Sequence, residues 1–248
     1  MKSKMIFSII ALIIVLGLTA GLGYGYYQKQ TFKFDNPIVT MEIEGYGTVK
    51  IELYPEYAPN TVKNFIKLIN EEYYNGLTFH RVESDLLIQG GDYAGDGTGN
   101  TEYTIKGEFS ANGYKENTLK YERGTLGLAR QDFSYYASLG SFLIEEGYNS
   151  GYAQFFIMTT EMSGFNGNYT AFGKVIEGIE IIDIITNLET VVKVNEETGE
   201  ETITNIPVDK PVITKMTVDT FGIEYGEPIV KKAFDINQFI MELYGISF

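Results

Sequence analysis

Short hydrophobic segments that alternate with polar positions run through most of the chain, and this pattern predicts a mainly β protein. Residues 38–43 and 48–53 alternate on either side of a Glu-Gly-Tyr-Gly turn, so they predict a β-hairpin. Residues 191–194 and 201–206 predict a second hairpin around Glu-Glu-Thr-Gly, and residues 211–218 predict a last strand.

Two segments have the spacing of amphipathic helices instead. Pro59 suits the first turn of a helix, where its missing N–H costs nothing. Hydrophobic residues follow it at helical spacing: Val62, Phe65, Ile66 and Ile69. Residues 177–187 repeat the pattern with isoleucines at 179, 182 and 185. The sequence therefore predicts one early and one late helix with strands between them.

The first 24 residues form a separate segment. Lys2 and Lys4 precede an apolar or small stretch from Met5 to Gly23, which is long enough to span a bilayer. A cleavable signal peptide has the same basic start and apolar core, so secretion after cleavage is the alternative. We expect an uncleaved anchor with its basic end in the cytoplasm and the rest of the chain outside it, after a linker at residues 25–37.

Composition removes several classes of function. The net charge of −14 argues against nucleic-acid binding, which needs a basic surface. The absence of cysteine excludes thiol catalysis, disulfides and cysteine-bound metals. A Ser-His-Asp hydrolase would have to use the single histidine, His80, and no Gly-x-Ser-x-Gly string accompanies it. We expect neither a metal nor another cofactor.

Three short strings carry the strongest signal: Phe79-His80-Arg81, then Gln89-Gly90-Gly91-Asp92, then Gln154-Phe155-Phe156-Ile157. In this order, with Phe172-Gly173-Lys174-Val175 downstream, they resemble the cyclophilin family of peptidyl-prolyl cis/trans isomerases. The resemblance covers residues 38–220 as one domain and implies a closed antiparallel eight-stranded barrel capped by two helices. Residues 221–248 form an extension beyond it.

Isomerisation of an X-Pro bond is rotation about an amide with a barrier of about 18–20 kcal/mol. No bond breaks, so the enzyme needs only groups that stabilise the twisted amide more than the planar one. A guanidinium can donate a charge-assisted hydrogen bond to the prolyl nitrogen as it loses conjugation. The resemblance implies that Arg81 is this catalytic group. Gln89 lies eight residues later, which puts both side chains on one face if the segment stays extended, although Glu83-Ser84-Asp85 indicates a break.

The resemblance also implies a set of substrate-binding residues: Leu86, Leu87, Gln89, Ala129, Arg130, Gln154, Phe156, Phe165 and Tyr169. An alternative interpretation of the aromatic members is that they are ordinary core residues. By alternation Phe155 should face the core and Phe156 the pocket. The position often held by tryptophan in the family is Gly164, so we expect any binding of a cyclosporin-type ligand to be weak.

Residues 131–153 replace a much shorter family loop with an insertion rich in apolar residues. Tyr135, Leu139, Phe142 and Leu143 fall near helical spacing and predict a short helix, which would act as a lid, a specificity element or a partner surface, or would partly occlude the groove. The extension has a second apolar stripe, from Phe234 to Leu243, which we expect to pack back on the barrel.

These observations favour a membrane-anchored isomerase that assists the folding of exported proteins by acting on their proline-containing segments. Two alternatives stay open. One is a catalytically weak cyclophilin-like module that binds peptides, or serves as a scaffold, at the cell envelope. The other is a structural envelope protein whose insertion and extension make the important contacts.

Overall fold

A computed structural model describes Gly17, Thr19 and residues 35–99, 101, 103–194 and 200–245. The chain divides into two compact units, Met1–Asp35 and Asn36–Phe248. The anchor predicted over residues 1–24 lies outside the described residues, apart from Gly17 and Thr19. Within the part of the chain that is described, no helix has the length and apolar character needed to cross a membrane.

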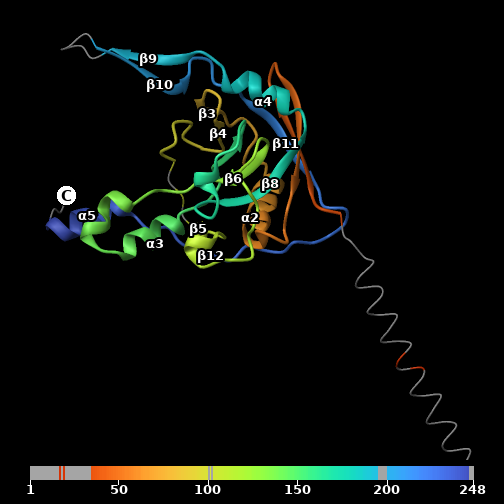
Figure 1. Ribbon diagram of the computed structural model, residues 1–248, viewed down its shortest axis with the longest axis horizontal. Coiled ribbons are helices and arrows are strands. Elements are labelled where there is room, and N and C mark those ends of the chain that lie inside the picture. The colour runs from red at the N-terminus through yellow and green to blue at the C-terminus, as the bar shows by residue number, and fades with distance from the viewer. Residues whose placement is uncertain are drawn as a thin grey trace, which may run out of the picture. The chain divides into compact units, whose positions relative to one another are not determined.

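Eight strands form one antiparallel sheet in the order β11-β1-β2-β8-β6-β7-β4-β3 (Figure 1). Their bounds are β1 Ile38–Ile43, β2 Gly47–Leu53, β3 Phe79–Glu83, β4 Leu87–Gly90, β6 Thr125–Leu128, β7 Phe155–Met158, β8 Thr170–Glu177 and β11 Ile213–Asp219. The first predicted hairpin is β1 and β2, and the last predicted strand is β11. A separate hairpin of β9 (Thr190–Val194) and β10 (Glu201–Pro207) matches the second prediction.

The prediction of a closed barrel is wrong, because the sheet stays open between its edge strands β3 and β11. An isolated bridge between Thr78 and Val212 lies at this gap. Here the Phe79 N–H donates to the Pro211 carbonyl at 2.9 Å. Proline has no N–H with which to return the hydrogen bond, so a regular ladder cannot continue through Pro211.

Both predicted capping helices are present, as α2 (Pro59–Asn70) and α4 (Ile179–Thr186). They bury hydrophobic faces in the core: Val62, Phe65, Ile66, Leu68 and Ile69 from α2, and Ile182 and Ile185 from α4. The first turn of α2 has no capping side chain of its own, since Ala58 precedes it. Glu108 supplies the acceptors from a distant loop: its carboxylate accepts from the Asn60 N–H at 2.9 Å, the Thr61 N–H at 2.8 Å and the Thr61 hydroxyl at 2.7 Å.

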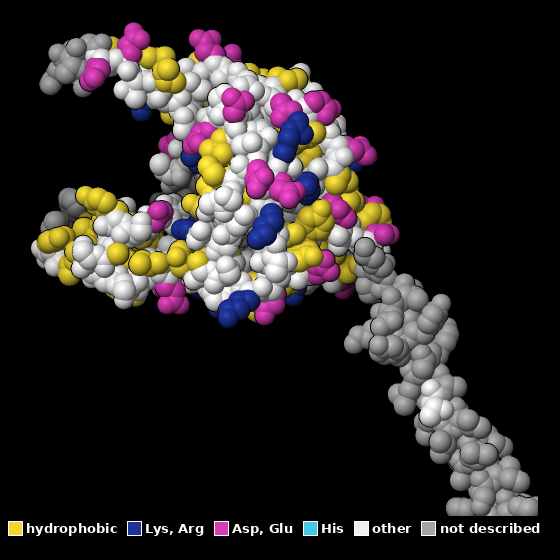
Figure 2. Space-filling view, in the orientation of Figure 1, with side chains coloured by type: hydrophobic (Ala, Val, Ile, Leu, Met, Phe, Trp, Pro, Cys, Tyr) yellow, Lys and Arg dark blue, Asp and Glu magenta, His cyan; other side chains and the backbone are white. Residues whose placement is uncertain are grey.

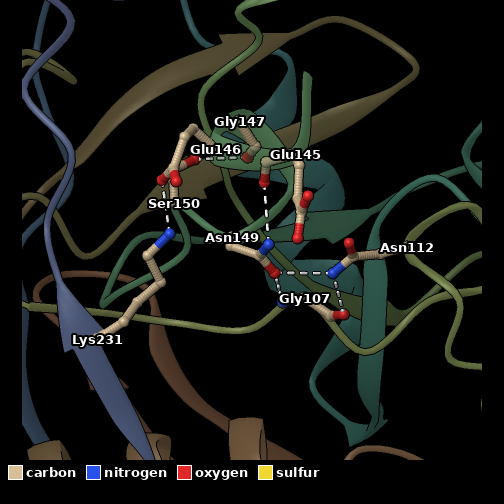
Figure 3. A network of polar contacts seen from close by, with 8 residues as sticks. All are labelled: Gly107, Asn112, Glu145, Glu146, Gly147, Asn149, Ser150 and Lys231. Carbon is tan, nitrogen blue, oxygen red and sulfur yellow. Dashed lines mark hydrogen bonds and ion pairs between the residues drawn. The ribbon is translucent and has the colours of Figure 1, made fainter. Parts of the chain in front are cut away.

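The insertion is helical, as predicted, but it forms two pieces separated at Gly140 instead of one helix: a 3-10 helix, η2 (Ser134–Leu139), and a short α-helix, α3 (Phe142–Tyr148). Asn149, at the end of α3, binds it to the neighbouring loop (Figure 3). Its side-chain oxygen accepts from the Gly107 N–H at 3.2 Å and from Asn112 Nδ2 at 2.8 Å. The short helices η1 (Ser110–Asn112) and η3 (Ser163–Phe165) complete the connections.

The C-terminal extension packs on the insertion rather than on the barrel alone. Its strand β12 (Val230–Lys232) pairs with β5 (Tyr103–Ile105), and its helix α5 spans Ile236–Tyr244. The Phe239 ring lies 5.4 Å from Phe142 of α3, and Lys231 forms an ion pair with Glu146 at 2.5 Å. Figure 2 shows hydrophobic side chains gathered over this arm of α3 and α5.

Removing the carboxylate of Glu108 should destabilise the fold, because two buried donors of Thr61 and one partly buried donor of Asn60 lose their acceptor. We expect Glu108→Ala to lower the free energy of unfolding by about 2–4 kcal/mol, given about 1–3 kcal/mol for each donor left unsatisfied and partial replacement by water. Urea denaturation measures it. Glu116→Ala, which removes an exposed carboxylate from the same loop, is the control. A Glu108→Ala variant as stable as that control would contradict the capping role.

Candidate active site

Cross-strand pairing places the predicted catalytic and pocket residues in one row. Arg81 on β3 lies opposite Gln89 on β4, which lies opposite Phe156 on β7. Phe156 lies opposite Gly127 on β6, and Gly127 opposite Ala171 on β8. Residues directly opposite one another in a sheet present their side chains on the same face. The convergence of Arg81 and Gln89 is confirmed, but by a β3–β4 hairpin that turns at residues 84–86 and not by one extended segment.

A continuous line of hydrogen bonds runs from Arg81 along this face. Arg81 Nη1 donates to Gln89 Oε1 at 2.8 Å, and Gln89 Nε2 donates to Gln154 Oε1 at 2.9 Å. Gln154 Nε2 then donates to Asp92 Oδ1 at 3.1 Å. The other terminal nitrogen of Arg81, Nη2, forms an ion pair with Glu83. The guanidinium is therefore held at two nitrogens.

Phe156 is the centre of a hydrophobic cluster distinct from the main core. Its buried members are Leu87, Tyr121, Phe156, Met158 and Ala171. Four predicted pocket residues pack against them and stay partly exposed: Leu86, Ala129, Phe165 and Tyr169. Phe155 points into the main core, as predicted. The cluster thus presents an apolar surface directly beside the Arg81–Gln89 pair.

Three rings and one glycine fix the orientation of the Phe156 ring. Tyr121 stacks on it at 5.6 Å between centroids, and Phe165 and Tyr169 meet it edge-on at 5.7 and 5.8 Å. A Cβ on Gly127 would clash with the ring, so the ring lies on bare backbone. Tyr121 was not predicted as a site residue, since nothing in its local sequence distinguishes it from a core tyrosine.

Arg130 lies at the rim of this cluster, beside the insertion. Its guanidinium carbon is 4.5 Å from the centre of the Tyr169 ring and 4.9 Å from that of Tyr148 in α3. The neighbouring Ala129 N–H donates to the Gln154 carbonyl at 2.9 Å. Gly164, at the family's tryptophan position, faces open space, because an added Cβ would meet no described atom within 4 Å.

His80 and Asp92 are buried next to the site and do not carry its chemistry. The pairing of β3 with β4 is irregular between Phe79 and Arg81, and His80, which lies in this irregularity, has its ring against Gly97. Burial lowers the pKa of His80, and neither ring nitrogen has a hydrogen-bond partner among the described residues. Asp92 accepts from the N–H groups of Gly97 at 2.9 Å and Gly99 at 3.0 Å, and these bonds hold the glycine-rich loop of residues 93–99 in a turn. The described part of the chain holds no group of side chains suited to a metal ion.

The fold and site define a cyclophilin-type isomerase, and comparison with known proteins supports this class. The family model for cyclophilin type peptidyl-prolyl cis-trans isomerase/CLD matches residues 38–218, so the chain belongs to this family. Peptidyl-prolyl cis-trans isomerase B of Bacillus subtilis (strain 168) is 38% identical over 155 residues, covering 62% of this chain and 94% of that protein. A Helicobacter pylori (strain J99) isomerase is 33% identical over 141 residues, covering 56% and 75%.

A solved structure agrees with these relatives. The cyclophilin type isomerase of Cryptosporidium parvum, crystallised in the presence of the dipeptide Ala-Pro, has a TM-score of 0.56 and 28% identity, covering 73% of this chain and 98% of that chain. The chain is thus a member of an enzyme family that catalyses peptidyl-prolyl cis-trans isomerisation.

The hydroxyl of Tyr121 allows a test of the ring stack. Tyr121 is fully buried and its hydroxyl has no partner in the described structure. Removing an unsatisfied buried hydroxyl should stabilise the fold, so we expect Tyr121→Phe to raise the free energy of unfolding by about 1 kcal/mol and to keep isomerase activity. Tyr121→Leu, which removes the stacked ring, should lower kcat/KM. Chemical denaturation and a peptide isomerisation assay measure both effects, and a destabilised Tyr121→Phe would show that the hydroxyl is satisfied.

Proposed function

We propose that this isomerase acts on proline-containing segments of exported proteins and that Arg81 stabilises the twisted prolyl amide. The observation that carries the proposal is the position of the Arg81 guanidinium, which is held by Gln89 and Glu83 at the edge of the Phe156 cluster. The crystallisation of the Cryptosporidium parvum relative in the presence of Ala-Pro supports a proline peptide as the ligand.

Rotation of the prolyl amide needs one N–H donor for the prolyl nitrogen and one for a substrate carbonyl, and Arg81 and Gln89 can supply them. A guanidinium has five N–H donors, and within the described part of the chain Arg81 uses one on Gln89 and one on Glu83, which leaves others for the prolyl nitrogen. The amide of Gln89 has two N–H donors and uses one on Gln154, so the second can hold a substrate carbonyl. The partly exposed members of the Phe156 cluster, among them Leu86, Phe165 and Tyr169, offer the apolar surface for the pyrrolidine ring.

In this mechanism the substrate turns between two fixed contacts. Gln89 holds the carbonyl on one side of the amide, and the apolar cluster holds the proline ring on the other. As the amide leaves planarity, its nitrogen gains a lone pair that Arg81 can bind. Because that hydrogen bond exists only in the twisted form, it lowers the barrier instead of tightening ground-state binding.

Arg81→Ala tests the assignment directly. We expect kcat/KM for an Ala-Pro tetrapeptide to fall about 10- to 1,000-fold, up to the loss observed for one preorganised transition-state donor. The assay uses the full-length chain in detergent, with thermal unfolding measured in parallel. Arg123→Ala, which breaks an ion pair with Asp183 outside the site row, is the matched control. Equal activity of Arg81→Ala and the control would refute the role of Arg81.

We further propose that residues 1–24 anchor the domain on the outer side of the cytoplasmic membrane. The basic start at Lys2 and Lys4 and the apolar stretch that follows support this arrangement. Protease added to intact protoplasts should digest the domain and leave a short membrane-protected N-terminal fragment. Release of the whole domain into the medium would indicate cleavage instead, and a domain protected until lysis would contradict export.

A further inference from the structure

Glu83, the last residue of β3, binds the proposed catalytic arginine directly. Residues 81 and 83 share one face of the strand, and the Glu83 carboxylate forms an ion pair with Arg81 Nη2. Both side chains are partly exposed, Arg81 at 41% and Glu83 at 22%. From the sequence, Glu83 indicated only a break in the strand.

The same carboxylate oxygen has a second partner from a different element. Asn205 Nδ2, on β10, donates to Glu83 Oε1 at 3.1 Å. The pairing of β10 with β9 is irregular between Ile203 and Pro207, so Asn205 is not part of the regular ladder. The Thr204 hydroxyl donates to the Val191 carbonyl at 2.7 Å and holds this irregular stretch. Figure 1 shows β10 beside β3, which is where this contact joins the two elements.

We propose that Glu83, held by Asn205, is a positioning residue that fixes the orientation of the Arg81 guanidinium for the isomerisation. This inference rests on the proposed function, since it acts through Arg81. Gln89 holds Nη1 and Glu83 holds Nη2, and two contacts on different nitrogens define the plane of the guanidinium. The hairpin of β9 and β10 thereby acts on Arg81 through Asn205 and Glu83 and not through a contact of its own with the substrate.

Charge is the reason that Gln89 alone does not suffice. The guanidinium is ionised, so both of its hydrogen bonds are charge-assisted, but only the Glu83 carboxylate adds the attraction of a full opposite charge. Arg81 is long and partly exposed, so it loses substantial side-chain entropy when held. The chain also carries 33 acidic against 19 basic residues, which gives a loosened guanidinium other carboxylates to bind. A donor already in place costs no reorganisation in the transition state.

The test measures kcat and KM separately for the full-length chain on an Ala-Pro tetrapeptide. Glu83→Gln removes the charge and keeps the shape, and Glu83→Ala removes both. We expect kcat to fall about 3-fold and about 10-fold respectively, in line with a partly exposed, charge-assisted contact, with KM changed less than about 2-fold. Asn205→Ala should lower kcat about 2-fold. Glu177→Gln, which breaks the strand-end ion pair with Lys50 outside the site row, should leave both constants unchanged.

Salt and a double-mutant cycle distinguish positioning from general stability. At about 1 M salt the Debye length falls to about 3 Å, so the wild-type kcat should approach that of Glu83→Gln, which should itself change little. In an Arg81→Ala background, Glu83→Gln should have no further effect. A loss that persists in that background would overturn the inference.

The remaining outcomes separate the two proposals. If Arg81→Ala loses activity and both Glu83 variants match the wild type, the positioning role is wrong and the proposed function stands. If Arg81→Ala retains wild-type activity, the proposed function fails, and the positioning role fails with it.

Discussion

The pairing register of five neighbouring strands is the constraint on which the site depends. Because side chains alternate with a period of two, a slip of one residue between β3 and β4 or between β4 and β7 would turn Arg81, Gln89 or Phe156 to the opposite face. The same alternation places Phe155 in the main core. The register that buries Phe155 in the core is therefore also the register that places Phe156 on the site face. The core thereby fixes the geometry of the active site without contributing an atom to it.

Polar hydrogen bonds and hydrophobic packing meet in this row of paired residues. The line from Arg81 through Gln89 and Gln154 is polar and partly exposed and ends on the buried Asp92, whereas the cluster around Phe156 is apolar, with a buried centre and partly exposed margins. They meet where Gln89 and Phe156 lie opposite each other on adjacent strands. A prolyl peptide has the same division, with a polar amide next to an apolar ring. In the proposed mechanism this boundary would place the amide at the donors when the ring enters the cluster.

Hydrophobic patterns predicted the elements, and the resemblance to the family indicated Arg81, Gln89 and Phe156. Both failed where the structure depends on contacts between distant segments. Hydrophobic periodicity located both capping helices and the hairpins, because each pattern lies within one segment. The stacking of Tyr121 on Phe156 and the contact between Glu83 and Asn205 join residues far apart in the chain. The open sheet edge likewise follows from the proline at position 211 meeting β3, which no single segment reveals.

The insertion and the β9–β10 hairpin each reach the neighbourhood of the site through a single side chain. Tyr148 of the insertion lies against Arg130 at the rim, and Asn205 of the hairpin binds the Glu83 carboxylate beside Arg81. The extension packs on the insertion through Phe239, so it supports the rim contact indirectly. Deleting the insertion would leave the apolar side chains of α5 without their partner, and would confuse a change in specificity with a loss of folding. Point variants at these contacts are therefore the informative probes of how the added segments influence catalysis.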